Sequence, residues 1–147
     1  MEQLPRAQRT QRAIILNLLC VLRASVANYL KNMITIYGIP NCDKVRAARK
    51  WLEAHDVEHQ FHDFRKDGLD LQLLLGWVKE LDWETLLNRR GTTWRKLPEA
   101  LVKDLDQGKA FQLMLDEPTL IKRPVLDLGD GRYQVGFSEA EYEELFA

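Results

Sequence analysis

The sequence contains few cysteines and little net charge, and each shortage excludes a class of protein. Its 147 residues include two cysteines, Cys20 and Cys42, too few for a disulfide framework and not arranged as a CxxC pair. The formal net charge of −1 leaves no basic field for nucleic acid or for an anionic membrane surface. No glycine-rich phosphate loop, Ser-His-Asp arrangement or paired catalytic carboxylates stand out. Single-thiol chemistry in a reducing cytosol fits this composition best.

Residues 1–32 differ in pattern from the rest of the chain, so we assign the folded domain to residues 33–147. Their apolar run at 13–22 follows three arginines and is far too short to span a bilayer. It is compatible with a signal peptide, although Arg23 at its end argues against one, or with an added amphipathic helix. A third interpretation is that translation begins at Met33, and we favour it because a single-thiol enzyme suits the cytosol.

Cys42 lies at a predicted junction between a strand and a helix. Residues 34–37 alternate β-branched and aromatic side chains, a glycine and a proline follow, and a helical pattern begins just after Cys42. The free N–H groups and positive dipole of a helix start favour a thiolate, and Lys44 and Arg46 add positive charge. This pattern predicts a reactive cysteine, with a small buried core residue as the alternative.

The rest of the chain predicts the order β-α-β, a helical insert, then β-β-α. That is a thioredoxin-like α/β fold with the insert between its two halves, and the strand–helix–strand spacing implies a parallel crossover. Asp70 is an expected helix cap, and Ser138 with Glu141 forms an expected capping box. The predicted elements are helices at 43–55, 70–81, 83–87, 98–106, 109–116 and after Ser138, and strands from Ile34 and at 57–64, 125–128 and 133–137. We expect residues 88–95 to form a polar loop.

Four basic residues, Arg90, Arg95, Lys122 and Arg123, fall in predicted loops and at strand edges. Guanidinium groups there suit an anionic ligand, since they pair bidentately with carboxylates and oxyanions, although ordinary surface charge is the simpler explanation for any one of them. Arg123 is the most informative, because it precedes Pro124 and an X–Pro bond can be cis. We expect this loop to face Cys42, with the guanidinium aimed at the thiol.

His55, His59 and His62 could suggest a metal site. On a strand, however, His59 and His62 point to opposite faces, and no second cysteine or acidic set completes a tetrahedral site. We therefore predict that the chain binds no metal there.

Several motifs spread over the domain are shared with one protein family. They are YGIPNCD at 37–43, FHDFRKDGL at 61–69, LNRRGTTWRKL at 87–97, IKRP at 121–124 and GFSE at 136–139. Through them, residues 33–147 resemble the arsenate reductase (ArsC)/Spx family of thioredoxin-like proteins, most closely its YffB branch.

The resemblance implies a cytoplasmic reductase with Cys42 as its nucleophile and glutathione as its thiol co-substrate, without a bound cofactor. Arg123 matches the arginine that arsenate reductases use near the catalytic thiol, and Arg46 matches another family arginine. In this interpretation Asn41 supplies a neutral donor and Arg90 contributes to substrate binding. The implied partners are glutathione and a small oxidised or disulfide substrate, with neither nucleic acid nor membrane involved.

Three departures from the arsenate reductases change the expected substrate. Gly38 stands in place of a histidine before the active-site loop, and Asn88 and Gly136 stand in place of two arginines. A tetrahedral oxyanion would thus lose two cationic contacts of about 1.5–3 kcal/mol each. We therefore expect a glutathione-dependent thiol oxidoreductase, with arsenate reduction as one alternative. A Spx-like protein that binds RNA polymerase is another, matched less well because Val45 replaces the second cysteine of a CxxC switch.

Overall fold

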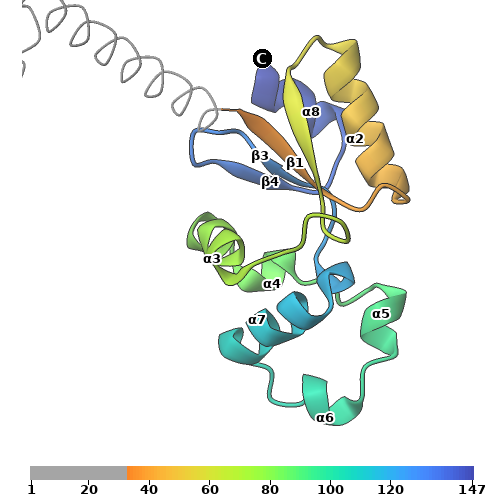
Figure 1. Cartoon of the computed structure of the whole chain (residues 1–147), viewed down its shortest axis with the longest axis vertical. Coiled ribbons are helices and arrows are strands. Elements are labelled where there is room, and N and C mark those ends of the chain that lie inside the picture. Colours follow the sequence, from red (N-terminus) through yellow and green to blue (C-terminus); the bar gives the residue numbers. More distant parts are fainter. Residues whose placement is uncertain (1–32) are drawn as a thin grey trace, which may run out of the picture. The chain divides into compact units, whose positions relative to one another are not determined.

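A four-stranded sheet in the order β2-β1-β3-β4 organises residues 33–147, the part of the chain that the computed structural model describes (Figure 1). The predictions for residues 1–32 lie outside this part. The central strand β1 pairs in parallel with β2 and antiparallel with β3, and β3 pairs antiparallel with β4. The strands are β1 (Ile34–Gly38), β2 (His59–Asp63), β3 (Val125–Asp127) and β4 (Tyr133–Val135). Both the predicted parallel crossover and the predicted hairpin are present.

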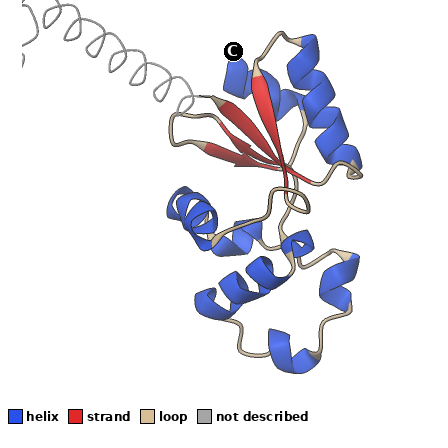
Figure 2. Ribbon diagram, viewed as in Figure 1, coloured by secondary structure: helices blue, strands red, loops and turns tan. Residues whose placement is uncertain are grey.

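The helices fall into two groups, as Figure 2 shows: α2 and α8 beside the sheet, and an insert between β2 and β3. The flanking helices are α2 (Asp43–Ala54) and α8 (Glu139–Phe146). The insert contains α3 (Leu71–Glu80), α4 (Trp83–Leu86), α5 (Thr92–Arg95), α6 (Glu99–Val102), α7 (Gln107–Asp116) and the 3-10 turn η1 (Pro118–Leu120). The predicted element order is therefore correct. Within residues 33–147, no helix combines the length and apolar character needed to cross a membrane.

Two predictions within the insert were wrong. Residues 88–95 contain the helical turn α5 rather than only a polar loop, and the helix expected at 98–106 shrinks to α6. Tertiary contacts stabilise α5, because the hydroxyl groups of Thr93 and Thr119 are 3.0 Å apart and Trp94 packs against the core. After α6, Asp104 has a φ of 51°, and this left-handed backbone interrupts any longer helix.

Strand alternation divides the apolar residues between two cores, one on each face of the sheet. Ile36 belongs to a cluster with residues of α2 and α8, whereas its neighbour Tyr37 packs with the insert, including Trp77. In β3, Leu126 and Val125 divide in the same way. This period of two is what a strand covered on both faces requires. Helices α2 and α8 therefore cover one face and the insert begins on the other (Figure 1).

Side-chain caps begin helices α3 and α8 where the sequence predicted them. The Asp70 carboxylate accepts a hydrogen bond from the Leu73 N–H at 2.8 Å. At α8, Ser138 Oγ donates to Glu141 Oε2 at 2.7 Å and accepts from the Glu141 N–H at 3.4 Å. These contacts satisfy helix N–H groups that have no partner within the helix. Both predicted caps are confirmed.

The corner between β1 and α2 generates a stability prediction, because a Cβ on Gly38 would lie 2.6 Å from Val45 Cγ2. Val45 is fully buried, so it cannot move into solvent to relieve the contact. We expect Gly38→Ala to lower the free energy of unfolding by about 1–3 kcal/mol, the usual cost of overpacking. Urea denaturation measures the change.

The matched test repeats Gly38→Ala in a Val45→Ala background, where the opposing methyl groups are gone. The cost of Gly38→Ala should fall well below its wild-type value. An equal cost in both backgrounds would show that Val45 is not the obstacle.

Candidate active site

Cys42 occupies the N-cap position of α2, where the sequence placed it. Its backbone is extended, with φ −98° and ψ 124°, and its N–H donates to the Ile39 carbonyl at 3.1 Å. The Cys42 carbonyl accepts from the Arg46 N–H at 3.0 Å and so opens the helix. Cys42 is half-buried and is the free cysteine of the described residues. It is therefore not the fully buried core residue that was the alternative.

The loop of Arg123 and Pro124 lies at the same end of the sheet as Cys42. Tyr37 pairs with Val125 in the antiparallel ladder, so extending that register by one residue places Pro124 opposite Gly38. The Arg123–Pro124 peptide bond is cis, and the Pro124 carbonyl accepts from the Gly136 N–H at 2.8 Å. The expected juxtaposition of this loop with the Cys42 corner is thus present in the backbone.

The Arg123 side chain is half-buried and turns partly toward the insert. Its Nη1 donates to the Thr119 carbonyl at 3.2 Å, and its buried Nε has no hydrogen-bond partner among residues 33–147. In the same part of the chain, no hydrogen bond joins Arg123 to the Cys42 side chain. The structure therefore brings Arg123 to the correct edge of the sheet, while its direct action on the thiol stays a prediction.

Arg46 and Asn41 flank Cys42 on the exposed side of the corner. Arg46 forms an ion pair with Asp43 across the first turn of α2, with the two side chains 63% and 90% exposed. An anionic ligand that reaches Arg46 must compete with this carboxylate. Asp43 was not among the predicted site residues, although its three-residue spacing from Arg46 is a pattern that favours an ion pair on a helix. Asn41 is exposed beside the thiol.

Arg90 belongs to a loop that backbone hydrogen bonds tie to the segment before Arg123. The Asn88 N–H donates to the Leu120 carbonyl and the Lys122 N–H to the Leu86 carbonyl, each at 2.7 Å. The Arg90 N–H donates to Asn88 Oδ1 at 3.2 Å. Arg90 and Lys122, which the sequence suggested together as anion-binding residues, therefore lie in neighbouring segments.

The three departures from the arsenate reductases have structural counterparts. A side chain at Gly38 would collide with Val45, so a histidine does not fit this corner. Gly136 has a φ of 87°, a conformation that disfavours arginine. Asn88 uses its side-chain oxygen within its own loop. At these three positions the structure accommodates the residues present and does not supply the histidine and arginines that arsenate reductases have there.

The histidines engage backbone carbonyls. His59 Nδ1 lies 2.9 Å from the Val57 carbonyl oxygen, and His62 Nε2 lies 2.7 Å from that of Gly68. His55 Nδ1 lies 2.8 Å from the Trp51 carbonyl oxygen. In the described residues, no group of three or more His, Cys, Asp or Glu side chains is placed to hold a metal ion.

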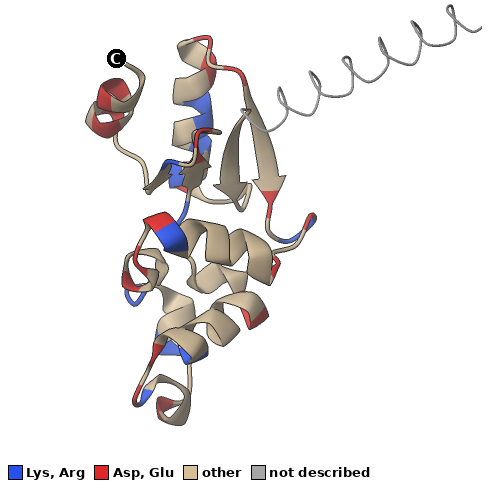
Figure 3. Cartoon of the chain, turned by 90° about the vertical axis from the view of Figure 1, so that its left-hand side faces the viewer, with Lys and Arg blue, Asp and Glu red and all other residues tan. Residues whose placement is uncertain are grey.

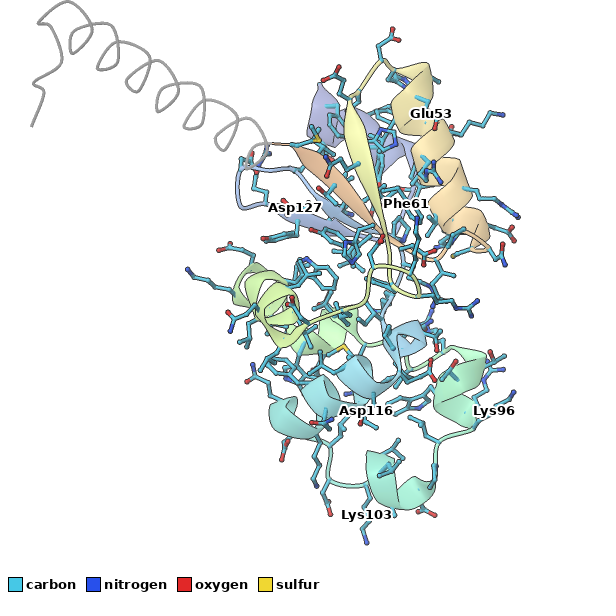
Figure 4. The ribbon with its side chains drawn as sticks, in the orientation of Figure 1. Glu53, Phe61, Lys96, Lys103, Asp116 and Asp127 are labelled. Atoms are coloured by element: carbon cyan, nitrogen blue, oxygen red, sulfur yellow. The ribbon has the colours of Figure 1, made fainter. Side chains whose placement is uncertain are left out.

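Tyr37, directly before Gly38, is the ionisable residue of β1. Burial, with a smaller contribution from the nearby Asp127 carboxylate, raises its pKa to about 12. Burial also raises the pKa of Asp127, which lies on β3 opposite Thr35 and so at the other end of β1 from Cys42 (Figure 4). Tyr37 stays protonated at neutral pH, which leaves Cys42 as the candidate nucleophile of this corner.

Basic residues predominate on α2, whereas the charged residues of α8 are acidic (Figure 3). Exposed Lys44, Arg46 and Lys50 lie on α2, whose first turn follows the thiol. Helix α8 carries the glutamates Glu139, Glu141, Glu143 and Glu144. A chain of almost zero net charge thus presents a local positive field beside Cys42, which favours anionic ligands.

Comparison with known proteins shows relatives that match the whole described domain. An uncharacterized protein of Haemophilus influenzae is 49% identical over 115 residues, which are 78% of this chain and all of that protein. The solved structure of a protein named YffB superposes with a TM-score of 0.75 at 48% identity, over 78% of this chain and all of that one.

Two further relatives show the functional range of these similarities. An arsenate reductase-related protein of Brucella melitensis has a TM-score of 0.64 at 50% identity, over 78% of this chain and 94% of its own. The global transcriptional regulator Spx of Streptococcus mutans is 32% identical over 74% of this chain and 80% of its own. The fold is therefore thioredoxin-like, as predicted, and supports an enzyme of the thiol oxidoreductase type. Because the profile of the ArsC family matches residues 37–145 as well, the chain belongs to the ArsC family.

Proposed function

We propose that this protein is a glutathione-dependent thiol oxidoreductase that uses Cys42 as its single nucleophile. The observation that carries the proposal is the half-exposed thiol at the start of α2, with no second free cysteine in the described part of the chain. A helix start stabilises the thiolate, and the thiolate is the nucleophile in disulfide exchange. The proposal places the protein in the cytoplasm, where glutathione keeps thiols reduced.

Cys42 takes part in two exchange steps. First, the Cys42 thiolate attacks one sulfur of the substrate disulfide; a bond forms between these sulfurs, the substrate S–S bond breaks, and the other half leaves as a thiolate. Second, a glutathione thiolate attacks the substrate sulfur of the mixed disulfide, and Cys42 leaves as a thiolate. The product is a mixed disulfide of glutathione and the substrate half, and a second glutathione thiolate attacks its glutathione sulfur, which releases the remaining substrate thiolate and forms glutathione disulfide. Two glutathione molecules thus supply the two electrons that reduce the substrate. Glutathione resolves the intermediate because Val45 occupies the position of a CxxC partner.

The charged residues of the corner have supporting roles in this proposal. Arg123 directly precedes Pro124 at the thiol end of the sheet, and in this proposal its guanidinium turns from the Thr119 carbonyl to an anionic substrate group. Arg46 serves the same purpose once an anion displaces Asp43. Asn41 supplies an uncharged donor beside the thiol.

Two alternatives follow from the similarities. Arsenate reduction is disfavoured because neither Asn88 nor Gly136 supplies a cation to an oxyanion. A Spx-like role, in which the protein binds RNA polymerase and performs no chemistry, is favoured by the relatives named Spx. An enzyme uses Cys42 in every catalytic cycle, whereas the regulator performs no chemistry, so the following experiment separates the enzymatic role from the regulatory one.

The purified full chain should reduce a model disulfide such as hydroxyethyl disulfide with glutathione, and Cys42→Ser should reduce the rate to that of the uncatalysed reaction. Cys20→Ser is the matched control and should retain the wild-type rate. The measurement is glutathione disulfide formation, coupled to glutathione reductase, with arsenate tested in parallel. Activity that survives in Cys42→Ser would refute the assignment of the nucleophile, and an inactive wild type would favour the regulator.

Arg123→Ala should slow the alkylation of Cys42 by iodoacetamide at pH 7 by up to about tenfold, because in the proposed role Arg123 brings a positive charge to the thiol, and losing that charge disfavours the thiolate. Arg123→Lys should restore most of the alkylation rate but less of the glutathione turnover, because lysine cannot reproduce the guanidinium fork. Thermal denaturation of each variant separates these effects from loss of the contact with Thr119. Equal turnover in wild type, Lys and Ala variants would exclude Arg123 from the site.

A further inference from the structure

A surface depression of about 380 Å³ lies beside the end of α4, and neither exchange step of Cys42 described above uses it directly. Two segments far apart in sequence form its walls, joined by the bridge between Leu87 and Ile121 and its flanking hydrogen bonds. Its lining consists of Glu84, Leu87, Asn88, Arg89, Arg90 and Lys122. Three cations, one carboxylate and one amide thus line a single small depression.

The three cations are not equivalent. Arg89 donates to Glu84 Oε1 at 2.9 Å, and its guanidinium lies 5.7 Å from the Trp83 ring centroid and 6.0 Å from that of Trp94. Its charge is therefore already used to hold the insert together. Arg90 and Lys122 have no ion-pair partner among the described residues, and both are exposed. They are the charges available to a ligand.

Asn88 is oriented by its own loop. Its Oδ1 accepts the Arg90 N–H, which leaves its amide NH₂ as a donor. A Cβ on Gly91 would lie 3.0 Å from Asn88 Nδ2, so the glycine leaves room for this orientation. Glu84 keeps its second carboxylate oxygen without a hydrogen bond in residues 33–147. The depression thus offers two cations and an amide donor near one carboxylate acceptor.

The two cations, the amide donor and the carboxylate acceptor complement an α-amino-acid head group. In such a group a carboxylate and an ammonium are attached to one carbon, and both are ionised near pH 7. The depression also adjoins, along the chain, the segment that leads to the thiol end of the sheet. Lys122 is two residues from Pro124, a span of at most about 7 Å, and Pro124 lies opposite Gly38. An extended tripeptide covers about 10 Å.

We propose that the depression binds the α-amino-acid end of a γ-glutamyl thiol. Arg90 and Lys122 bind its carboxylate with the Asn88 amide, and Glu84 accepts from its ammonium group. The inference rests on the proposed function and deepens it, because it states why glutathione, and not any small thiol, resolves the mixed disulfide. The simpler alternative is a basic surface that binds any anion without selectivity.

The test compares KM values of the full chain for glutathione and for cysteinylglycine, which lacks the γ-glutamyl group. Lys122→Ala and Arg90→Ala should each raise the KM for glutathione about tenfold, the size of one charge-assisted hydrogen bond, with kcat changed less than about twofold. Neither should change the KM for cysteinylglycine. Lys103→Ala is the matched control, since Lys103 lies in the insert far from the sheet in Figure 4 and should leave both values unchanged.

The outcomes distinguish this inference from the proposed function. If the wild type turns over neither thiol, the proposed function fails, and the head-group site is then tested by NMR titration with S-methylglutathione. Binding that Lys122→Ala weakens supports the site. Absent binding, or equal binding by wild type and variant, overturns it. If the wild type is active but the variants raise the KM for glutathione and the KM for cysteinylglycine by the same factor, the head-group assignment is wrong. Inorganic phosphate that binds as tightly as S-methylglutathione would also refute it, by showing an unselective anion patch.

Discussion

The close packing of Val45 beneath Gly38 is the contact on which the candidate site depends. It brings the first turn of α2 against the end of β1, with the Val45 methyl groups in the space where any other residue at position 38 would place its Cβ. Cys42 is the N-cap of that turn, so its thiol takes its position from this corner. The same contact leaves no room for a histidine before the active-site loop. One apolar contact therefore both positions the nucleophile and removes a feature of the arsenate reductases.

The second constraint is the register of the sheet. Because β1 is central, its carboxyl end meets the end of β2 and the beginning of β3. This geometry gathers the Cys42 loop, the segment after Asp63 and the Arg123–Pro124 loop at one edge, although they are far apart in sequence. The insert contributes through Leu87 and Ile121, which join the Arg90 loop to the residues before Arg123. The functional candidates thus converge because of strand order, not because of proximity along the chain.

The ion pairs decide which of the basic residues are available for binding. Arg46 and Arg89 have carboxylate partners, whereas Arg90 and Lys122 have none in the described residues. In sequence all four are simply cations near polar segments. This difference in pairing shifts the expected anion site from the helix beside Cys42 toward the depression at the end of α4. It also fits a ligand with one end at the thiol and a charged end farther away.

Sequence patterns alone were enough to predict the α/β class, the element order, the caps at Asp70 and Ser138, and the place of Cys42 at a helix start. These features follow from local rules of periodicity and capping, which act over a few residues. The same patterns did not predict the turn α5, the short α6 or the partners of the charged side chains. Those depend on contacts such as Thr93 with Thr119 and Arg89 with Glu84 and two tryptophans. Such features depend on the folded chain, because the energy of an ion pair or a packed turn depends on which residues from distant parts of the sequence lie next to it.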